Sequence, residues 1–468
     1  MVALKQSIRG ELKRGIAYIL MLLSIFLLLY NTGVEFKRII SVVIFASVVA
    51  GSLLFWRFRL VFTLVGVSTL LGLGLINVKT LLEFAGFDII LFLAATMIIV
   101  GFLEERRFFE YLVYRITPLA GSASKLVILM MILSAFFAAL VGEVTSILFM
   151  VSIMFHLLSR YKLDPIPMIM MLVFATNVGS GATLVGNPVG VMIALRAGLS
   201  FFDFLRWATP ISLVALVITI FLSTRYFKYY IDVLDEALKR DAKGINLNKN
   251  RGEFKHIWLD FTLFVSILIL LILHSQIENL LGLEKNSMLL GAVLLGAGIC
   301  LLIEKDRARE IVELRVDWWT LLFFILFFSI VGTLEYTGIT EELAKALLKV
   351  AGENWPLLFS LVSIITALMS GFMDNVLAVA TFIPLVKKLE ILGGVNTYPL
   401  WWILLFSGTI FGNLTVIGST ANIVAVGMLE KGKLGHISFL KWLKIGLLAS
   451  IPAWMVAVLL VYLQIPLM

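Results

Sequence analysis

Charged residues, cysteine and catalytic histidine motifs are scarce in this sequence. Asp, Glu, Lys and Arg make up 15% of the 468 residues, whereas soluble domains carry about 25%. The single cysteine, Cys300, excludes a disulfide framework, a CxxC motif and a thiolate metal site. The four histidines form no HExxH motif, and no Walker or dinucleotide loop occurs. These absences argue against an enzyme and against a chain that itself uses ATP.

Apolar runs are what the sequence has in abundance. Hydrophobic residues make up 61% of the chain, and the mean hydropathy is +1.04. Many runs reach the 17 to 25 residues that a helix needs to cross about 30 Å of hydrocarbon. The sequence therefore predicts an all-α polytopic membrane protein whose main partner is the lipid bilayer. We place eleven full spans, at 15–30, 39–56, 59–78, 87–103, 165–195, 206–226, 258–276, 286–303, 317–333, 398–428 and 440–463.

The basic residues indicate an orientation. The net charge is +8, and most Lys and Arg lie between the apolar runs. The N-terminus and the segment 225–255 are both basic and are separated by six predicted crossings, so they lie on one side, which the positive-inside rule makes the cytoplasm. We expect a multi-pass protein of the plasma membrane with a cytoplasmic N-terminus. No basic stripe with interleaved aromatics occurs, so nucleic acid is not an expected partner.

Two acids stand inside apolar stretches at one spacing. Glu143 lies between the runs 124–141 and 144–159, and Asp374, in the matching segment about 232 residues later, lies between 355–372 and 376–389. Ionised groups at membrane depth are costly and tend to mark functional sites. Apolar arms that meet at a polar tip predict a re-entrant hairpin, in which non-helical backbone lines a protein cavity. Two ordinary spans joined by a tight loop are the alternative.

An internal repeat accompanies the hairpins. Residues 183–188 match 415–420 at an offset of 232, and 101–104 match 332–335 at 231. Each copy contains five predicted crossings, an odd number, so the second copy is inverted; inverted repeats with interrupted helices are typical of secondary transporters. The predicted division is an extra first helix at 1–35, a first repeat at 36–227, a cytoplasmic linker at 228–257 and a second repeat at 258–468.

Glycine and small polar residues interrupt the predicted spans 165–195 and 398–428. Such a break exposes carbonyls that suit a cation and amides that suit an anion, although close packing through small residues is the alternative. We expect the hairpin tips and the breaks to form one ion-binding site. Its predicted residues are Glu143, Val144, Thr145, Asn177, Thr183, Gly186, Asn187, Pro188, Asp374, Asn375, Asn413, Thr415, Gly418, Ser419, Thr420 and Asn422.

At these motifs the chain resembles an ion transporter superfamily that includes the arsenical-pump membrane subunit, NhaD-type sodium/proton antiporters, the melanosomal P protein and citrate-metal carriers. The motifs that carry the resemblance are 182–188, 199–205, 373–376 and 412–422. The resemblance implies an eleven-span fold with paired hairpins, a homodimer, and a transport domain that moves against a scaffold. It also implies that a separate ATPase subunit can associate with the chain.

Two departures from the family pattern concern the charge of the site. Relatives usually carry Asp-Asn-Val-Thr at the first hairpin, where this chain has Gly142-Glu143-Val144-Thr145. The family's Gly-Asp-Pro-Pro-Asn is here Gly-Asn-Pro-Val-Gly, at 186–190, which removes an acid. Both changes bear on which ion is transported.

The predicted function is secondary active transport by alternating access. A cavity that holds Glu143 and Asp374, with no Lys or Arg in either motif, attracts a cation. Desolvation and mutual repulsion let a proton compete with a metal cation for the carboxylates. We therefore predict a cation (sodium)/proton antiporter, with Glu143 and Asp374 as sodium ligands and no other cofactor. The alternatives are an anion or oxyanion carrier for arsenite, citrate or another carboxylate, coupled to protons or sodium, and a passive ion channel.

Overall fold

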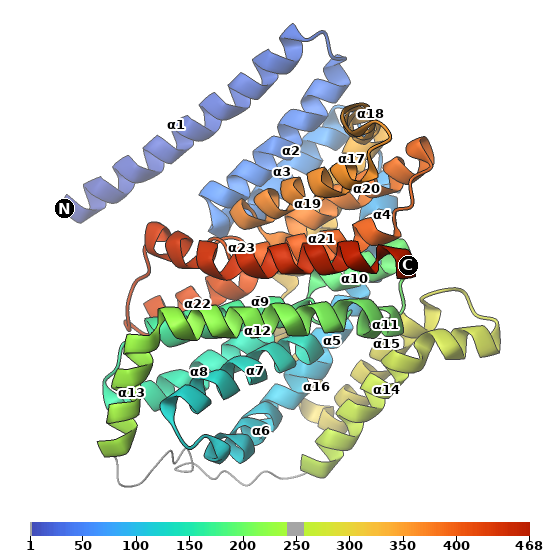
Figure 1. Ribbon diagram of the computed structural model, residues 1–468. Coiled ribbons are helices and arrows are strands. Elements are labelled where there is room, and N and C mark those ends of the chain that lie inside the picture. Colours follow the sequence, from blue (N-terminus) through green and yellow to red (C-terminus); the bar gives the residue numbers. More distant parts are fainter. Residues whose placement is uncertain (1, 241–256) are drawn as a thin grey trace. The chain divides into compact units, whose positions relative to one another are not determined.

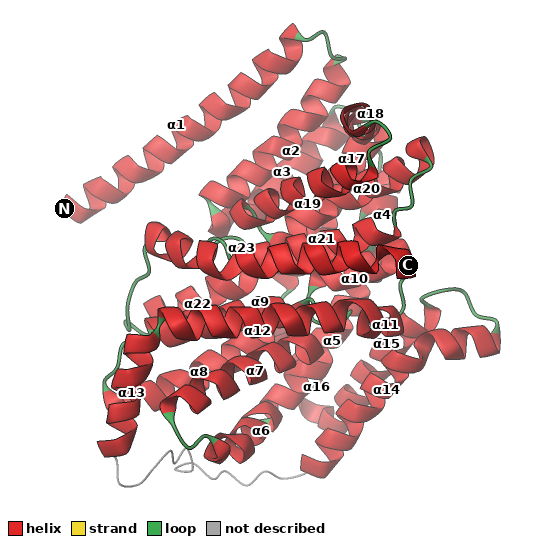
Figure 2. Cartoon of the chain, in the orientation of Figure 1, coloured by secondary structure: helices red, strands yellow, loops and turns green. Residues whose placement is uncertain are grey.

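The computed structural model describes residues 2–240 and 257–468, and the regular elements in these ranges are helices (Figure 1, Figure 2). Eleven helices within the same ranges are long and apolar enough to cross a membrane, but they are not the eleven predicted spans. They include the hairpin arms Ala123–Val141, Glu143–Tyr161 and Trp355–Phe372, whereas the predicted spans 59–78, 165–195 and 398–428 consist of shorter helices. The chain is therefore an all-α polytopic membrane protein, as predicted. Of the predicted linker, residues 228–240 form helix α13 (Lys228–Arg240), and 241–256 lie outside the described residues.

The helices gather into two compact units, and each unit takes segments from both halves of the chain. The first contains Met1–Ile90, Asp317–Leu358 and Ala380–Thr397. The second contains Leu91–Val316, Phe359–Val379 and Tyr398–Met468.

In the first unit α17 packs against α2, α3, α4 and α18. Arg59 is buried beside it and donates a hydrogen bond of 2.5 Å to the Thr320 hydroxyl. The complete helices of this unit are α1 (Val2–Asn31), α2 (Phe36–Leu54), α3 (Arg59–Gly72), α4 (Val78–Phe84), α17 (Trp318–Tyr336) and α18 (Ile339–Ala351).

The predicted span 59–78 is not one helix. Helix α3 ends at Gly72, and Gly74 follows with φ +65°, a conformation that suits glycine. Asn77 then caps α4 by accepting a hydrogen bond of 2.9 Å from the Thr80 N–H. The apolar run therefore contains a turn that hydropathy does not reveal.

The second unit holds the first predicted hairpin, both broken helices and the tip of the second hairpin; the helices are labelled in Figure 1. Three of its helices, α5 (Phe87–Glu105), α19 (Trp355–Phe372) and α20 (Asn375–Gly393), continue from or into the first unit. Its other helices are α6 (Phe108–Ile116), α7 (Ala123–Val141), α8 (Glu143–Tyr161), α9 (Ile166–Ser180), α10 (Pro188–Ala197), α11 (Phe201–Asp203), α12 (Thr209–Tyr226), α13, α14 (Ile257–Leu281), α15 (Ser287–Glu304), α16 (Ala308–Arg315), α21 (Tyr398–Phe411), α22 (Thr420–Lys431) and α23 (Phe439–Gln464).

Both hairpins and both helix breaks occur where the sequence predicts them. Helices α7 and α8 meet at Gly142, and α19 and α20 meet at Met373 and Asp374. Residues 181–187 interrupt α9 and α10, and 412–419 interrupt α21 and α22. Helix α8 packs against α9 and α22, and α10 packs against α21, so elements from the two halves of the chain meet around the first hairpin.

Candidate functional site

The first hairpin tip is held to the first helix break by two hydrogen bonds. Gly142 adopts φ +92°, and α8 begins at the next residue, Glu143. The Glu143 N–H donates a hydrogen bond of 2.9 Å to the carbonyl oxygen of Gly186 in the break. The Thr183 hydroxyl donates to the carbonyl oxygen of Ala139 on α7. The backbone around Glu143 is therefore fixed against the break.

The second tip is held by the equivalent two bonds. The Asn375 N–H donates to the carbonyl oxygen of Gly418 at 3.1 Å. The Thr415 hydroxyl donates to the carbonyl oxygen of Gly371 at 2.6 Å. All four residues lie 232 positions after their counterparts in the first half. The structural equivalent of Glu143 is therefore an amide, Asn375, and not the acid of the second motif.

Neutral hydrogen-bond donors surround the Glu143 carboxylate. The residue is 2% exposed. Its Oε2 accepts a hydrogen bond of 3.1 Å from the Ser180 hydroxyl. Its Oε1 accepts from the Ser419 hydroxyl at 3.3 Å and from the Asn375 amide at 3.5 Å. Among the side chains described, those of residues 12–240 and 257–468, no Lys or Arg forms an ion pair with it, so none of them supplies a counter-ion.

The second acid, Asp374, is linked to the same helix terminus. It is 2% exposed and accepts a hydrogen bond of 3.0 Å from the Val376 N–H. The Thr420 hydroxyl donates to its other carboxylate oxygen at 2.9 Å. Thr420 directly follows Ser419, the donor to Glu143. The start of α22 therefore contacts both predicted acids.

Buried asparagine amides close the helix breaks. Asn177 on α9 donates to the side-chain oxygens of Asn413 at 2.7 Å and Asn422 at 2.8 Å. The Asn422 amide in turn donates to the carbonyl oxygens of Gly412 at 2.7 Å and Thr415 at 2.8 Å. These carbonyls lie where the helix ends and lack helical partners. The three asparagines therefore join the two broken helices and satisfy their exposed backbone.

Ser180 is a site residue that the sequence prediction missed. Its hydroxyl donates to Glu143 and accepts a hydrogen bond of 2.8 Å from the Asn187 amide, whose oxygen caps α10 through the Gly190 N–H at 2.8 Å. The equivalent position in the second half is Gly412, so the repeat gave no signal. The sequence feature that could have identified Ser180 is its position between two glycines, Gly179 and Gly181.

Asn375 offers an unused acceptor beside the carboxylate. Its Oδ1 is buried and has no hydrogen-bond partner among the described residues. Buried polar atoms of this kind are nearly always bonded. Together with the oxygens of Glu143, Ser180 and Ser419 it gives an all-oxygen set, the type that hard cations take. No cluster of three or more His, Cys, Asp or Glu side chains suited to a metal occurs in the described ranges.

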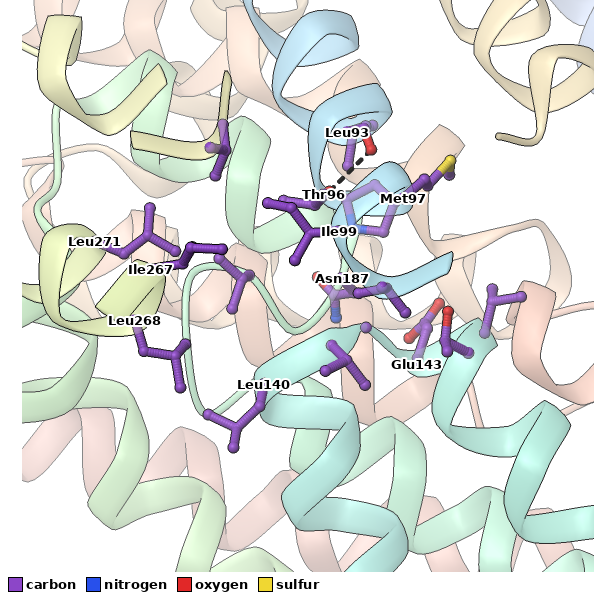
Figure 3. Close-up of a pocket in the computed structure, with 18 of the residues that line it drawn as sticks. Leu93, Thr96, Met97, Ile99, Leu140, Glu143, Asn187, Ile267, Leu268 and Leu271 are labelled. Carbon is purple, nitrogen blue, oxygen red and sulfur yellow. Dashed lines mark hydrogen bonds between the residues drawn. The ribbon is translucent and has the colours of Figure 1, made fainter. Parts of the chain in front are cut away.

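A cavity of about 110 Å³ adjoins the first hairpin tip. Figure 3 shows Glu143 and Asn187 beside it, with apolar side chains from α5 and α14 around them. Three further predicted residues, Val144, Thr145 and Pro188, line it. Glu143 is the one ionisable residue in this lining, so the cavity presents a single acid within an apolar wall.

The comparisons with known proteins agree with this architecture. The family model described as the citrate transporter matches residues 52–350 and 317–467. The chain belongs to the citrate transporter family. An uncharacterised transporter of Mycobacterium bovis is 32% identical over 382 residues, which cover 80% of this chain and 85% of that protein. The human P protein is 27% identical over 436 residues, covering 78% of this chain and 52% of the P protein.

A solved structure supports the fold of this citrate transporter family member. The YdaH transporter of Alcanivorax borkumensis, whose topology is described as unusual, superposes with a TM-score of 0.56 over 83% of this chain and 87% of that chain. The sequence identity is 16%, so this likeness concerns the fold alone. The predicted superfamily resemblance is confirmed, and the protein is a multi-pass membrane transporter.

Proposed function

We propose that the protein exchanges a cation, most simply sodium, for protons by alternating access. The observation that carries this proposal is the buried Glu143 carboxylate, whose hydrogen-bond donors are neutral. An ionised carboxylate without a counter-ion costs several kcal/mol in a buried site. The site therefore favours a bound proton or a bound cation over the bare charge.

The same cost couples the two ions. When Glu143 holds a proton or a sodium ion, its own charge is neutralised and the site carries one negative charge fewer. The empty site with Glu143 ionised carries that additional buried charge, which is costly to move across the membrane region. After a sodium ion leaves on one side of the membrane, a proton must bind Glu143 before the site can face the other side again. The cycle therefore exchanges sodium for protons.

The proposed sodium ligands are oxygens of Glu143 and of the residues that contact its carboxylate. They are the Glu143 carboxylate, the unpaired Asn375 Oδ1, and the hydroxyls of Ser180 and Ser419, which can turn their protons away from a cation. Asp374 is a second acid close to this set, and the Thr420 hydroxyl links it to the start of α22. Thr183, Thr415, Gly186 and Gly418 fix the tips and are supporting residues in this proposal.

A carboxylate or oxyanion carrier is the second candidate. The description of the matched family, citrate transporter, favours it. The lining of the cavity beside Glu143 opposes it, because it contains an acid and no Lys or Arg. The third alternative, a passive channel, would differ from both carriers in its much higher transport rate. The homodimer, the plasma membrane location with a cytoplasmic N-terminus and the ATPase subunit stay predictions.

Proton movement in proteoliposomes tests the proposal. A pH-sensitive dye inside the vesicles reports alkalinisation or acidification when a sodium gradient is applied. We expect sodium-dependent proton movement in the wild type and its loss in Glu143→Gln and Asp374→Asn. Glu278→Gln is the matched control, because Glu278 is also buried but caps α15 through the Met288 N–H at 2.9 Å.

The alternatives give different results in the same vesicles. Uptake of labelled citrate or arsenite without sodium-dependent proton movement would support the anion carrier. Currents far above carrier rates would support the channel. Sodium-driven proton movement that persists in Glu143→Gln would overturn the proposed site while leaving exchange itself in place.

A further inference from the structure

Four polar side chains of helix α8 lie on one accessible face, which they share with Leu148 and Phe155. Thr145, Ser152, His156 and Ser159 recur at intervals of three to seven residues and are partly or fully exposed. Residues at such intervals share one side of a helix. A face directed at lipid is expected to be apolar, so this face is suited to water.

The opposite face of α8 is apolar and buried. Two buried residues of α8 are polar, namely Glu143 at its first position and Ser146, which donates to the carbonyl oxygen of Ser134 at 2.8 Å. The others are Ile147, Phe149, Met150, Val151, Ile153, Met154, Leu157 and Leu158. The corresponding arm of the second hairpin differs near its tip, because Leu377 stands at the position equivalent to Thr145 and is 1% exposed. The accessible polar face near the site is thus a property of the first hairpin.

Two cavities follow one another along this face. The first, beside Glu143, is lined by Thr145 on α8 and by Val100 on α5. The second, of about 240 Å³, is lined by Leu148 and Ser152 on α8 and by Glu104 on α5. From one cavity to the other the lining advances by three or four residues, about one turn, on both helices. The two linings therefore use neighbouring turns of α5 and α8.

Charged residues border the second cavity. Glu104, Arg107 and Glu110 line it, which gives two carboxylates and one guanidinium. Arg107 pairs with Glu110, with its Nε 2.6 Å from Glu110 Oε2, and Glu104 pairs with Arg315 at 3.2 Å. No lysine lies in the lining. The ion-paired network that includes these residues also contains Glu105, Glu310, Arg307 and Arg315, which gives four carboxylates against three guanidiniums. The entrance therefore has a small net negative charge and is suited to admit a cation.

We infer that the polar face of α8 and the cavity bordered by Glu104 and Glu110 form the aqueous pathway by which a cation reaches Glu143 from the side of α6. Val100 and Leu148 form the constriction between the two cavities, and Glu104 is the acid at the entrance. This inference rests on the proposed function for the identity of the ion. The access of water to α8 is argued from the structure alone.

Thiol labelling tests the pathway, and the chain is well suited to it. Its single cysteine, Cys300, is buried, so Cys300→Ala gives a cysteine-free background. Into it we would place Thr145→Cys or Ser152→Cys, with Met150→Cys as the control because Met150 lies on the same helix and is 0% exposed. Methanethiosulfonate reagents react with thiols that reach water, since the thiolate is the nucleophile and does not form in lipid.

We expect a positively charged, membrane-impermeant methanethiosulfonate to label Ser152→Cys and Thr145→Cys from one side of the membrane and to leave Met150→Cys unmodified. The negatively charged reagent should react more slowly. Glu104→Gln should reduce this difference in rate by about two- to fivefold, as expected for a charge at the rim of a pathway. Sodium should protect Thr145→Cys more than Ser152→Cys, because Thr145 lies nearer Glu143.

The outcomes separate the pathway from the transport proposal. Absence of labelling at both Thr145→Cys and Ser152→Cys, in protein that still exchanges sodium for protons, overturns the pathway and leaves the function intact. Labelling as expected, without any sodium-driven proton movement, leaves the pathway and removes the proposed ion. Equal labelling of Met150→Cys would show general loosening of α8 and would also overturn the inference.

Discussion

The Ser419 hydroxyl lies 3.3 Å from the Glu143 carboxylate, although 276 residues separate them, and it can donate its single proton either there or to Asn177 Oδ1 at 3.0 Å. Ser419 is also the N-cap of α22 and accepts from the Ala421 N–H at 3.2 Å. The second broken helix thus contacts the tip of the first hairpin at the candidate ion site. In the proposed function, a change in the ion at Glu143 would act on the start of α22 through this contact.

Ser419→Ala separates this contact from ordinary helix capping. The variant removes one proposed ligand oxygen from the sodium site, and a loss of about 1.4 kcal/mol in binding free energy would raise the KM for sodium about tenfold. The dependence of proton movement on sodium concentration measures it. Ser438→Ala is the control, since Ser438 caps α23 through the Lys441 N–H at 3.3 Å and has no carboxylate partner. Similar KM changes in both variants would contradict the account.

Asn375→Leu removes the unpaired amide oxygen and the donor to Glu143 while keeping a similar volume. We expect the KM for sodium to rise and the melting temperature to stay unchanged or increase, because an unsatisfied buried acceptor costs about 1 to 3 kcal/mol. Sodium titration and thermal unfolding in detergent give both values. A clear loss of thermal stability at an unchanged KM would show that Asn375 is structural.

Gly142→Ala tests whether the backbone at the first tip positions Glu143. A Cβ at Gly142 meets nothing within 4 Å, so its effect comes from φ +92° alone. Strain of this kind costs on the order of 1 to 3 kcal/mol. We expect weaker sodium dependence and a lower melting temperature. Gly121→Ala, which also meets open space but has no positive φ, should change neither.

Arg106→Met tests the ion pairs that join α5 to α14 and α15. Arg106 contacts the fully buried Asp260 at 3.4 Å and Glu304 at 2.9 Å. Removal of one partner of a buried pair costs about 3 to 5 kcal/mol. We expect a large fall in melting temperature, and the double variant with Asp260→Asn should recover part of it. If the melting temperature of the double variant does not recover, the stability of the buried Asp260 does not depend on its ion pair with Arg106.

Much of the fold follows from the sequence because membrane spans impose a strong apolar pattern. The hairpins at Glu143 and Asp374 and the breaks at 181–187 and 412–419 were predictable, since polar and glycine-rich residues interrupt that pattern. The turn at Gly74 was not, because it lies inside an apolar run. The grouping of helices into two units drawn from both halves depends on packing between distant segments, which hydropathy does not encode.

The candidate site was predictable in its acids and less so in its amides. Asn413 and Asn422 were expected to bind ions, and the structure shows them bonded to backbone carbonyls and to Asn177. Ser180 escaped notice because its equivalent is a glycine. Comparison of the two repeats identifies the residues that both halves share. A residue such as Ser180, which has no polar counterpart in the other half, is recognised as a site residue only from the folded structure.

The most direct measurement of the central claim is proton release on sodium binding. Calorimetric titration of the purified protein with sodium, in buffers of different ionisation enthalpy, counts the protons released for each ion bound. The account predicts proton release near the stoichiometry of one in the wild type and none in Glu143→Gln. Sodium binding without proton release in the wild type, or unchanged release in Glu143→Gln, would contradict it.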